Sequence, residues 1–380
     1  MEIKNTGYHS LCIGKISRGC RMCVKGRKLV LFVTGICPRR CYYCPLSEQK
    51  KDKDVIFANE RPVASDSDII EEAEISRAWG ASITGGDPLS VLKRTLHYIR
   101  LLKKKFGKGF HIHLYTTTEL INEKTLKLLY SAGLDEIRFH PDLSDESRWE
   151  RILPALKYSW DVGIEIPAIP GTEDAIKRLC DFSDGKIKFM NINELEISDT
   201  NANKLLEKRF RTKDRISYAV LGSEALAKKT LSYCRNKRFS VHYCTAKLKD
   251  SVQLAERIKI RAKSAKEKFD IVTKEGLFIR GAIYLPEIKP GFSYKKKIKD
   301  ISDKRKALIL RKLNAIAENL FLEYAIPRGL MKVDLQKMRI ITAAPIAEKL
   351  ANEFKKKGLI PAVLSQYPTF DQMEIELRFL

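Results

Sequence analysis

Short apolar runs alternate with amphipathic stretches from residue 29 to residue 245 of this 380-residue chain. In the stretches between the runs, apolar residues recur every three or four positions, as they do on one face of a helix. Repeated strand–helix units predict an α/β fold with a parallel sheet and right-handed crossovers, and six or more units in a row predict a partial or full β/α barrel. We expect its strands at 28–35, 81–85, 110–117, 136–140, 163–169, 186–193 and 239–244.

Amphipathic helices are expected between these strands, at 65–79, 89–106, 122–132, 145–160, 173–182 and 223–235. Three of them begin at residue types that cap helices, namely Ser65, Asn122 and Ser223. Three are expected to end at a glycine, namely Gly80, Gly107 and Gly133. In a β/α barrel, chemistry takes place at the C-terminal ends of the strands.

The pattern changes after residue 245. One long basic helix is expected first, followed by a hairpin around Lys274-Glu275-Gly276 and a lysine-rich linker at 289–306. Helices at 307–323 and 344–357, with strands near 337–342, 362–366 and 373–379, then indicate an α+β domain, for which a ferredoxin-like sandwich is one option. The chain therefore divides into an N-terminal extension with cysteines (1–27), a β/α barrel (28–245), a basic helix (246–268) and a C-terminal α+β domain (269–380).

Positive charge is in large excess, with 71 Lys and Arg against 47 Asp and Glu, a net charge of +24. The excess is concentrated in two segments: 19 basic against 7 acidic residues from Lys204 to Asp270, and 10 against 2 from Lys289 to Lys312. Such a surface attracts polyanions, which makes RNA, and tRNA in particular, a predicted partner. The alternative is the lysine-rich composition of a heat-adapted organism, although heat adaptation adds Glu along with Lys.

No stretch approaches the roughly 20 apolar residues that a membrane-spanning helix needs, and the first ten residues lack the apolar segment of a signal peptide. We therefore expect a cytoplasmic protein without membrane contact. In that reducing compartment the nine cysteines are not expected to form disulfides. Six of them fall between residues 12 and 44, which favours metal binding.

Three cysteines follow the first expected barrel strand, in the loop Cys37-Pro-Arg-Arg-Cys41-Tyr-Tyr-Cys44. Such a loop can present three thiolates to a four-iron, four-sulfur (4Fe–4S) cluster and leave the fourth iron without a protein ligand. Zinc is the alternative, but structural zinc sites are normally closed by four ligands. The spacing therefore favours a cluster with one open iron.

This Cys-x3-Cys-x2-Cys loop, with Tyr43 before its last cysteine, resembles the signature of the radical S-adenosylmethionine (SAM) superfamily. The resemblance implies that the open iron chelates SAM and that Tyr43 lies near the adenine. It also implies oxidoreductase-like chemistry, in which one electron from the cluster splits SAM into methionine and a 5′-deoxyadenosyl radical that abstracts hydrogen from a substrate. A second likeness is to the family's Gly-Gly-Glu-Pro motif, whose backbone binds the SAM ammonium and which here reads Gly85-Gly86-Asp87-Pro88. Within the superfamily the chain resembles an archaeal group related to the activating enzymes of pyruvate formate-lyase.

Further polar side chains stand at the ends of expected strands, where the resemblance implies that SAM lies. The candidates for contact with SAM or substrate are Tyr115, Thr117, Asn191 and Asn193. Near them, Arg138 and His140 are candidates for binding an anionic group. The alternative for each is a strand-end cap or an ion pair within the fold.

The cysteines outside the loop suggest a second metal site. Cys20 and Cys23 form a Cys-x-x-Cys pair, and Cys244 ends the last barrel strand, which returns beside the N-terminal segment when the barrel closes. With Cys12 or His242 as a fourth ligand, these three thiols could hold zinc or an auxiliary iron–sulfur cluster. The alternative is that Cys12 and Cys244 are small buried apolar residues.

Three functions are open at this stage. The preferred one is a radical SAM enzyme that modifies RNA, in particular tRNA. The second is a radical SAM activating or biosynthetic enzyme that acts on a protein or a small metabolite, and the third is a non-catalytic protein that binds zinc and RNA. Both enzymatic hypotheses imply an electron donor such as ferredoxin or flavodoxin.

Overall fold

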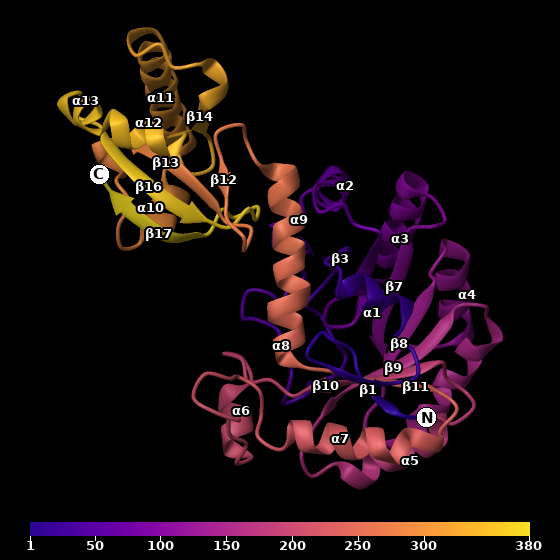
Figure 1. Cartoon of the computed structure of the whole chain (residues 1–380). Coiled ribbons are helices and arrows are strands. Elements are labelled where there is room, and N and C mark those ends of the chain that lie inside the picture. Colours follow the sequence, from indigo (N-terminus) through magenta and orange to yellow (C-terminus); the bar gives the residue numbers. More distant parts are fainter. The chain divides into compact units, whose positions relative to one another are not determined.

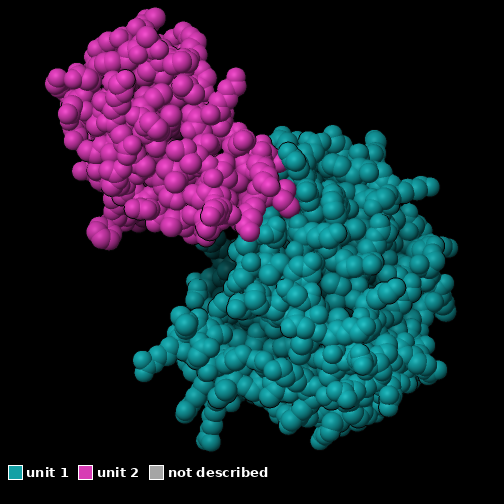
Figure 2. Space-filling view, in the orientation of Figure 1, with its two compact units in different colours: residues 1–257 teal, residues 258–380 magenta. Residues whose placement is uncertain are grey.

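The computed structural model describes residues 1–294 and 296–380. The chain divides into two compact units, Met1–Arg257 and Ile258–Leu380, which Figure 2 shows in teal and magenta. Each unit has its own sheet and its own buried apolar core. No helix among the described residues is long and apolar enough to cross a membrane.

Seven parallel strands form the centre of an eleven-stranded sheet in the first unit. In spatial order they are β11, β10, β9, β8, β7, β6 and β3, and all seven overlap the expected strands. The two edge strands, β1 (Ile3–Asn5) and β5 (Arg61–Pro62), do not pair with each other, so the barrel is partial rather than full. The bounds are β3 Lys28–Phe32, β6 Gly80–Thr84, β7 His111–Thr117, β8 Glu136–His140, β9 Asp161–Ala168, β10 Phe189–Glu194 and β11 Ser240–Cys244.

The longer helices between these strands, α2, α3, α4, α5 and α7, lie on the outer side of the sheet (Figure 1). Ser65 and Asn122 occupy the predicted cap positions, but Gly222 rather than Ser223 caps α7, because the Ser223 hydroxyl donates to the Ala168 carbonyl instead. The helix bounds are α2 Asp66–Ile75, α3 Leu92–Phe106, α4 Glu123–Ala132, α5 Glu173–Ser183, α6 Ala202–Glu207 and α7 Ser223–Tyr233.

Two expectations for these helices were wrong. Gly107 and Gly133 do end helices, but α2 stops at Ile75 and Gly80 is the first residue of β6. The stretch expected as an α-helix at 145–160 is a 3-10 helix, η2 Glu146–Lys157. It contains Pro154, which lacks the N–H that an α-helix interior needs.

The N-terminal extension adds two strands and a helix to the barrel unit, which the sequence pattern did not show. Strand β2 Leu11–Ile13 pairs antiparallel with β11, and β1 Ile3–Asn5 pairs antiparallel with β2, so both strands continue the sheet. The following helix, α1 Arg18–Cys23, contacts β3, β6 and β7 on the inner side of the sheet. At the opposite edge, β4 Phe57–Ala58 and β5 Arg61–Pro62 extend the sheet beyond β3.

The expected basic helix at 246–268 is a continuous helical segment of mixed type. It consists of α8 Ala246–Leu248, a π-helical turn Lys249–Leu254 and α9 Ala255–Ala265. Its residues are shared between the two units, because the boundary falls after Arg257.

The second unit has an antiparallel sheet in the order β14, β15, β13, β16, β17, with β12 paired to β13. Within it, β13, α11, β14, β15, the pair α12 and α13, and β16 follow one another in the ferredoxin-like pattern that was one option from the sequence, and β12 and β17 are additional strands. The expected linker at 289–306 contains a helix, α10, and the helix expected at 344–357 is two helices that meet at Leu350. The bounds are β12 Ile271–Val272, β13 Phe278–Tyr284, α10 Tyr294–Asp300, α11 Asp303–Glu323, β14 Met331–Asp334, β15 Arg339–Thr342, α12 Ala344–Lys349, α13 Ala351–Lys356, β16 Ile360–Gln366 and β17 Glu374–Phe379.

Candidate functional site

The loop after β3 carries Cys37, Cys41 and Cys44, and all three side chains are half-buried. Burial raises the pKa of Cys37 to about 12, and the neighbouring Cys41 and Cys44 add to this rise. A turn in which the Cys44 N–H donates to the Cys41 carbonyl at 3.2 Å folds the end of the loop. The loop therefore gathers three interacting thiols in one region.

Two glycines after β6, Gly85 and Gly86, pack against the backbone at the start of this loop. The Gly86 N–H donates to the Thr34 carbonyl and the Asp87 N–H to the Ile36 carbonyl, both at 2.8 Å. A Cβ atom on Gly85 would clash with the Thr34 carbonyl oxygen, and one on Gly86 would clash with the Ile36 carbonyl oxygen. Glycine is therefore required at both positions for the two backbones to approach this closely.

Contacts from β8 and from the segment before α6 hold the other side of the loop. The Asn201 amide donates to the Tyr43 carbonyl at 3.0 Å, and the Thr200 hydroxyl donates to the Leu46 carbonyl at 2.6 Å. Burial lowers the pKa of His140, which keeps its ring neutral. Its Nδ1 lies 2.8 Å from the Glu165 carbonyl and therefore donates, so Nε2 accepts from the Tyr43 hydroxyl at 3.0 Å.

A cavity of about 740 Å³ opens beside the cysteine loop, at the C-terminal ends of β8 and β9. This volume is in the range of sites that bind cofactors and small substrates. The strand ends are also where β/α barrels carry their active sites. Its lining includes Arg39, Cys41 and Tyr43 from the loop, Asp142 after β8, and Gly171 and Thr172 before α5.

Similarity to known proteins covers this same part of the chain. A family model described as the radical SAM superfamily matches residues 31–183, which include the cysteine loop and both glycines. A protein of Methanocaldococcus jannaschii, named "Putative glycyl-radical enzyme activating enzyme MJ0021", is 47% identical over 276 residues, which are 70% of this chain and 73% of the relative. The chain belongs to the radical SAM superfamily.

Solved structures of another radical SAM enzyme give a more distant match. Two structures of the methyltransferase TsrM from Kitasatospora setae match this chain with TM-scores of 0.36 and 0.35, at 12% and 13% identity. One contains tryptophan and a SAM analogue, and the other contains cobalamin and a 4Fe–4S cluster. The matches cover 63% and 61% of this chain, which spans about half, 52%, of each TsrM chain.

Radical SAM enzymes use a 4Fe–4S cluster and SAM, and the residues of this site fit both cofactors. Three thiols in one loop can each bind one iron of the cluster. The SAM ammonium needs hydrogen-bond acceptors, and the carbonyl oxygens of Gly85 and Gly86 accept no hydrogen bond from any other described residue. This superfamily membership makes the chain an enzyme and excludes the non-catalytic zinc and RNA hypothesis.

Asp87, which stands where the family motif has Glu, is fully buried by the fold. It accepts hydrogen bonds from the Leu89 N–H, the Thr116 hydroxyl, and both the N–H and the hydroxyl of Thr117, at 2.6 to 3.0 Å. Burial raises its pKa, and these hydrogen bonds oppose the rise. The side chains of Asp87 and Thr117 thus join the segment after β6 to β7.

The other predicted polar residues meet around Glu165 on β9. Its carboxylate accepts from the Asn191 amide at 2.8 Å, the Asn193 amide at 3.0 Å and the Arg138 guanidinium at 2.9 Å. Burial alone would raise the pKa of Glu165, but Arg138 and the two amides lower it overall. The Tyr115 hydroxyl accepts from the same guanidinium at 2.9 Å. The structure therefore brings Tyr115, Asn191 and Asn193 together, with part of their hydrogen-bonding capacity used internally.

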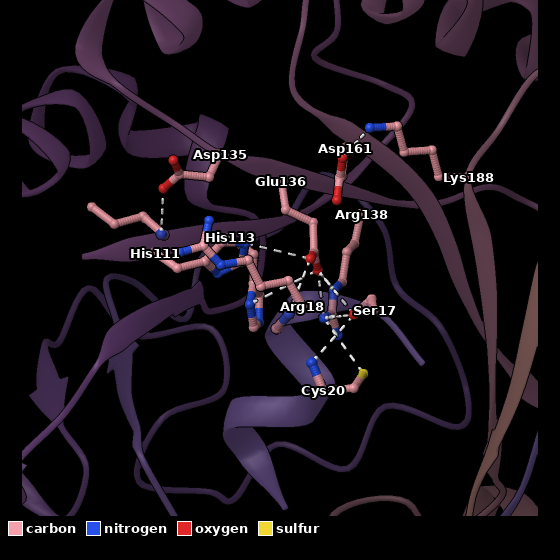
Figure 3. A network of polar contacts seen from close by, with 12 residues as sticks. Ser17, Arg18, Cys20, His111, His113, Asp135, Glu136, Arg138, Asp161 and Lys188 are labelled. Carbon is pink, nitrogen blue, oxygen red and sulfur yellow. Dashed lines mark hydrogen bonds and ion pairs between the residues drawn. The ribbon is translucent and has the colours of Figure 1, made fainter. Parts of the chain in front are cut away.

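Arg138 is the centre of a polar network inside the barrel (Figure 3). Only 2% of it is exposed, and besides Glu165 and Tyr115 its guanidinium donates to Glu136 at 2.6 Å and to Ser17 at 3.0 Å. These partners neutralise the charge, so Arg138 is not available for an anionic ligand, contrary to one expectation from the sequence. Ser17 and the neighbouring Gly19, whose N–H donates to Glu136 at 3.2 Å, tie α1 to this network.

The cysteines of the predicted second site also lie in this interior. The Cys20 thiol accepts from Arg138 at 3.5 Å and from Asn191 at 3.3 Å. Burial raises the pKa of Cys23 to about 12, and Cys20 adds to the rise. Cys20 and Cys23 also raise the pKa of the buried Cys244, so the three thiols are neighbours. Among the described residues, in the cysteine loop as in this interior, no three His, Cys, Asp or Glu side chains are arranged to hold a single metal ion, and the second site stays a prediction.

Several residues that shape the site gave no signal in the sequence. Arg39, Thr200, Asn201 and Glu136 hold the cysteine loop or the interior network through contacts between distant segments. Each belongs to a residue type that is common on protein surfaces. A lone polar residue is therefore assigned to the site only once the fold has placed it.

Proposed function

We propose that this radical SAM enzyme acts on a polypeptide and abstracts a hydrogen atom from a glycine of a partner protein. The observation that carries the proposal is the 47% identical relative, whose name describes a glycyl-radical enzyme activating enzyme. The alignment reaches 73% of that relative, so the similarity extends well beyond a short cofactor-binding motif. The RNA substrate expected from the charge has no comparable support.

When bound, the reduced cluster and SAM supply a 5′-deoxyadenosyl radical, which takes a hydrogen atom from the substrate and leaves as 5′-deoxyadenosine. The residues of the chain position these reactants. Cys37, Cys41 and Cys44 would hold the cluster, and the carbonyls of Gly85 and Gly86 would receive the SAM ammonium. The His140 ring, fixed by its hydrogen bond to the Glu165 carbonyl, holds the hydroxyl of Tyr43, which lines the cavity beside the loop.

The fold also determines how a substrate reaches this site. The inner side of the barrel is occupied by α1 and the Arg138 network. The cavity beside the loop opens at the strand ends, and a mobile peptide segment of a partner could enter there. An electron donor such as ferredoxin or flavodoxin remains a prediction from the chemistry.

Anaerobic reconstitution with iron and sulfide tests the cofactor chemistry. With dithionite and SAM, we expect the wild-type protein to form 5′-deoxyadenosine and the Cys41→Ala variant to form none. Cys180→Ala is the matched control, because Cys180 is buried in α5 against Cys234 and lies outside the loop. Equal product from wild type and Cys41→Ala would remove the assignment of the cluster to this loop.

Isotope transfer tests the substrate class. Protein and RNA fractions are prepared from the organism that makes this chain, the protein from cells grown on glycine deuterated at Cα and the RNA from cells grown on deuterated ribose. We expect the protein fraction to give 5′-deoxyadenosine that is one mass unit heavier. Deuterium from the RNA fraction alone would overturn the polypeptide proposal while leaving the radical SAM chemistry in place.

A further inference from the structure

The cysteine loop contains two adjacent arginines in very different environments. The Arg39 side chain is only 9% exposed. Arg40 is exposed and also lines the cavity. Both stand between Cys37 and Cys41, so both are close to the cluster site in sequence. Because they differ in burial, a variant of Arg40 can serve as the matched control for a variant of Arg39.

The Arg39 guanidinium connects the loop to the ends of two barrel strands. It donates to the carbonyl of His140, the last residue of β8, at 2.9 Å. It also pairs with Asp142 at 3.0 Å and approaches Glu119, which follows β7, at 3.9 Å. One buried side chain therefore fixes the loop against three points of the barrel. A planar guanidinium can make such contacts at the same time, whereas a lysine ammonium is a point charge.

The guanidinium also brings a positive charge into the cysteine loop, between Cys37 and Cys41, where the cluster would be bound. Arg39 also offsets Asp142 and Glu119. With Arg39 present, these three charged groups sum to one negative charge, and without it they sum to two. Because the side chains of Arg39 and Glu119 are only 9% and 14% exposed, this difference is only weakly screened by water and salt.

We propose that Arg39 is a positioning residue that orders the cysteine loop and raises the reduction potential of the cluster bound there. Reduction adds an electron to the cluster, and a nearby positive charge stabilises the reduced form. The inference rests on the cofactor assignment and is independent of whether the substrate is a polypeptide.

A redox titration followed by electron paramagnetic resonance compares Arg39→Gln with Arg40→Gln in the reconstituted protein. At the wild-type midpoint potential, we expect the ratio of reduced to oxidised cluster to fall about tenfold in Arg39→Gln, a shift of about 59 mV to lower potential for one electron. Arg40→Gln is expected to leave the potential unchanged, because its exposed charge is screened. An unchanged potential in Arg39→Gln, or equal shifts in both variants, would overturn the proposal.

Two further variants separate charge from position. Arg39→Lys keeps the charge, so we expect a wild-type potential. In the double variant Arg39→Gln/Asp142→Asn, residues 39, 142 and 119 together carry one negative charge, as in wild type. The reduction potential of the cluster should therefore return to the wild-type value. If Arg39→Lys shifts the potential as far as Arg39→Gln, charge is not the cause and the electrostatic part fails.

The ordering role is tested on the cluster-free protein by hydrogen exchange. We expect faster exchange of the amides of residues 37–44 in Arg39→Gln and in Arg39→Lys than in wild type, and no change in Arg40→Gln. This measurement also covers the case in which Arg39→Gln does not take up iron. Unaltered exchange in both Arg39 variants would show that the guanidinium does not order the loop.

Discussion

Both units of this molecule are built around a fully buried arginine, and the two arginines differ in what they connect. In the barrel unit, Arg138 is 2% exposed and donates to Glu136, Glu165, Tyr115, Ser17 and Cys20. In the second unit, Arg339 is 0% exposed and donates to Asp334, Glu374, Tyr284, Gln366 and Gln372. In both cases carboxylates and neutral acceptors surround the guanidinium, which is what a buried charge requires.

The partners of the two arginines come from different parts of the chain. Every hydrogen-bond partner of Arg339 belongs to its own sheet or the adjoining loop, and the most distant of these, Tyr284, is 55 positions away. Arg138 reaches Ser17 and Cys20 of the N-terminal segment, which are 121 and 118 positions away, and it also fixes Glu165 beside the candidate site. The same chemistry therefore stabilises one domain locally and, in the other, joins a distant helix to the site.

Exchanging each arginine for methionine gives the strongest test of this difference. Removing one partner of a buried ion pair leaves carboxylates without a counter-charge and costs about 3–5 kcal/mol. All three tryptophans lie in the barrel unit, so urea unfolding followed by tryptophan fluorescence reports on that unit. We expect Arg138→Met to lower its unfolding free energy by this amount and to reduce 5′-deoxyadenosine formation at least tenfold.

Arg339→Met is the matched control. It should leave the tryptophan transition and product formation unchanged, while circular dichroism shows an earlier unfolding step from the second unit. A tryptophan transition that shifts equally in both variants would mean that the two networks are not independent.

Gly19 tests the fit of α1 on the Arg138 network. A Cβ atom at this position would clash with Arg138, His113 and Glu136. We expect Gly19→Ala to lower the unfolding free energy of the barrel unit by about 3 kcal/mol, the upper end of the usual cost of overpacking. Gly109→Ala is the control, since no other atom lies within 4 Å of its added Cβ, and it should change stability by less than about 0.5 kcal/mol.

Acid should affect the barrel unit more than the second unit, because all six histidines lie in the barrel unit. Burial, aided by Lys28, lowers the pKa of His111 from 6.5 to about 2. Between these pH values the unfolded chain binds more protons than the folded one, so unfolding becomes easier as the pH falls below 6.5. Between pH 7.5 and 5.0, we expect the unfolding free energy of the barrel unit to fall by about 2 kcal/mol less in His111→Asn than in wild type. Urea unfolding followed by tryptophan fluorescence measures this difference. An identical loss in both proteins would contradict the buried, neutral state of His111.

The sequence predicted the seven central strands and the cysteine loop because both depend on local signals. A buried parallel strand is a short apolar run, and the spacing of Cys37, Cys41 and Cys44 is set by one cluster. Strands β1 and β2 were missed, since three residues are too few for a periodic pattern. The position of α1 was also missed, because it depends on the side chains of Arg138 and Glu136, more than 100 positions away.

The residues of the site also divide into those that local sequence signals identified and those that depend on distant contacts. Gly85 and Gly86 were identified through their motif, and the structure adds the reason, a close approach of two backbones. Asn191 and Asn193 were placed at the correct end of the sheet by the alternation of a strand, but their pairing with Glu165 depends on the register of β9 and β10. The role of Arg39 could not be predicted from the sequence. Arg39 differs from the adjacent Arg40 in its burial, and burial is determined by the fold.

The pairing of β2 with β11 has a consequence for synthesis on the ribosome. The hydrogen bond between Ser10 and His242 spans 232 positions, so Ser10 is made long before its partner in the barrel unit. During translation, β2 therefore lacks its pairing with β11 until that strand emerges from the ribosome. Contacts of such long sequence separation form late and slowly. A nascent barrel that lacks them exposes the edge of β10 to neighbouring chains, and chaperones are expected to protect it during this interval.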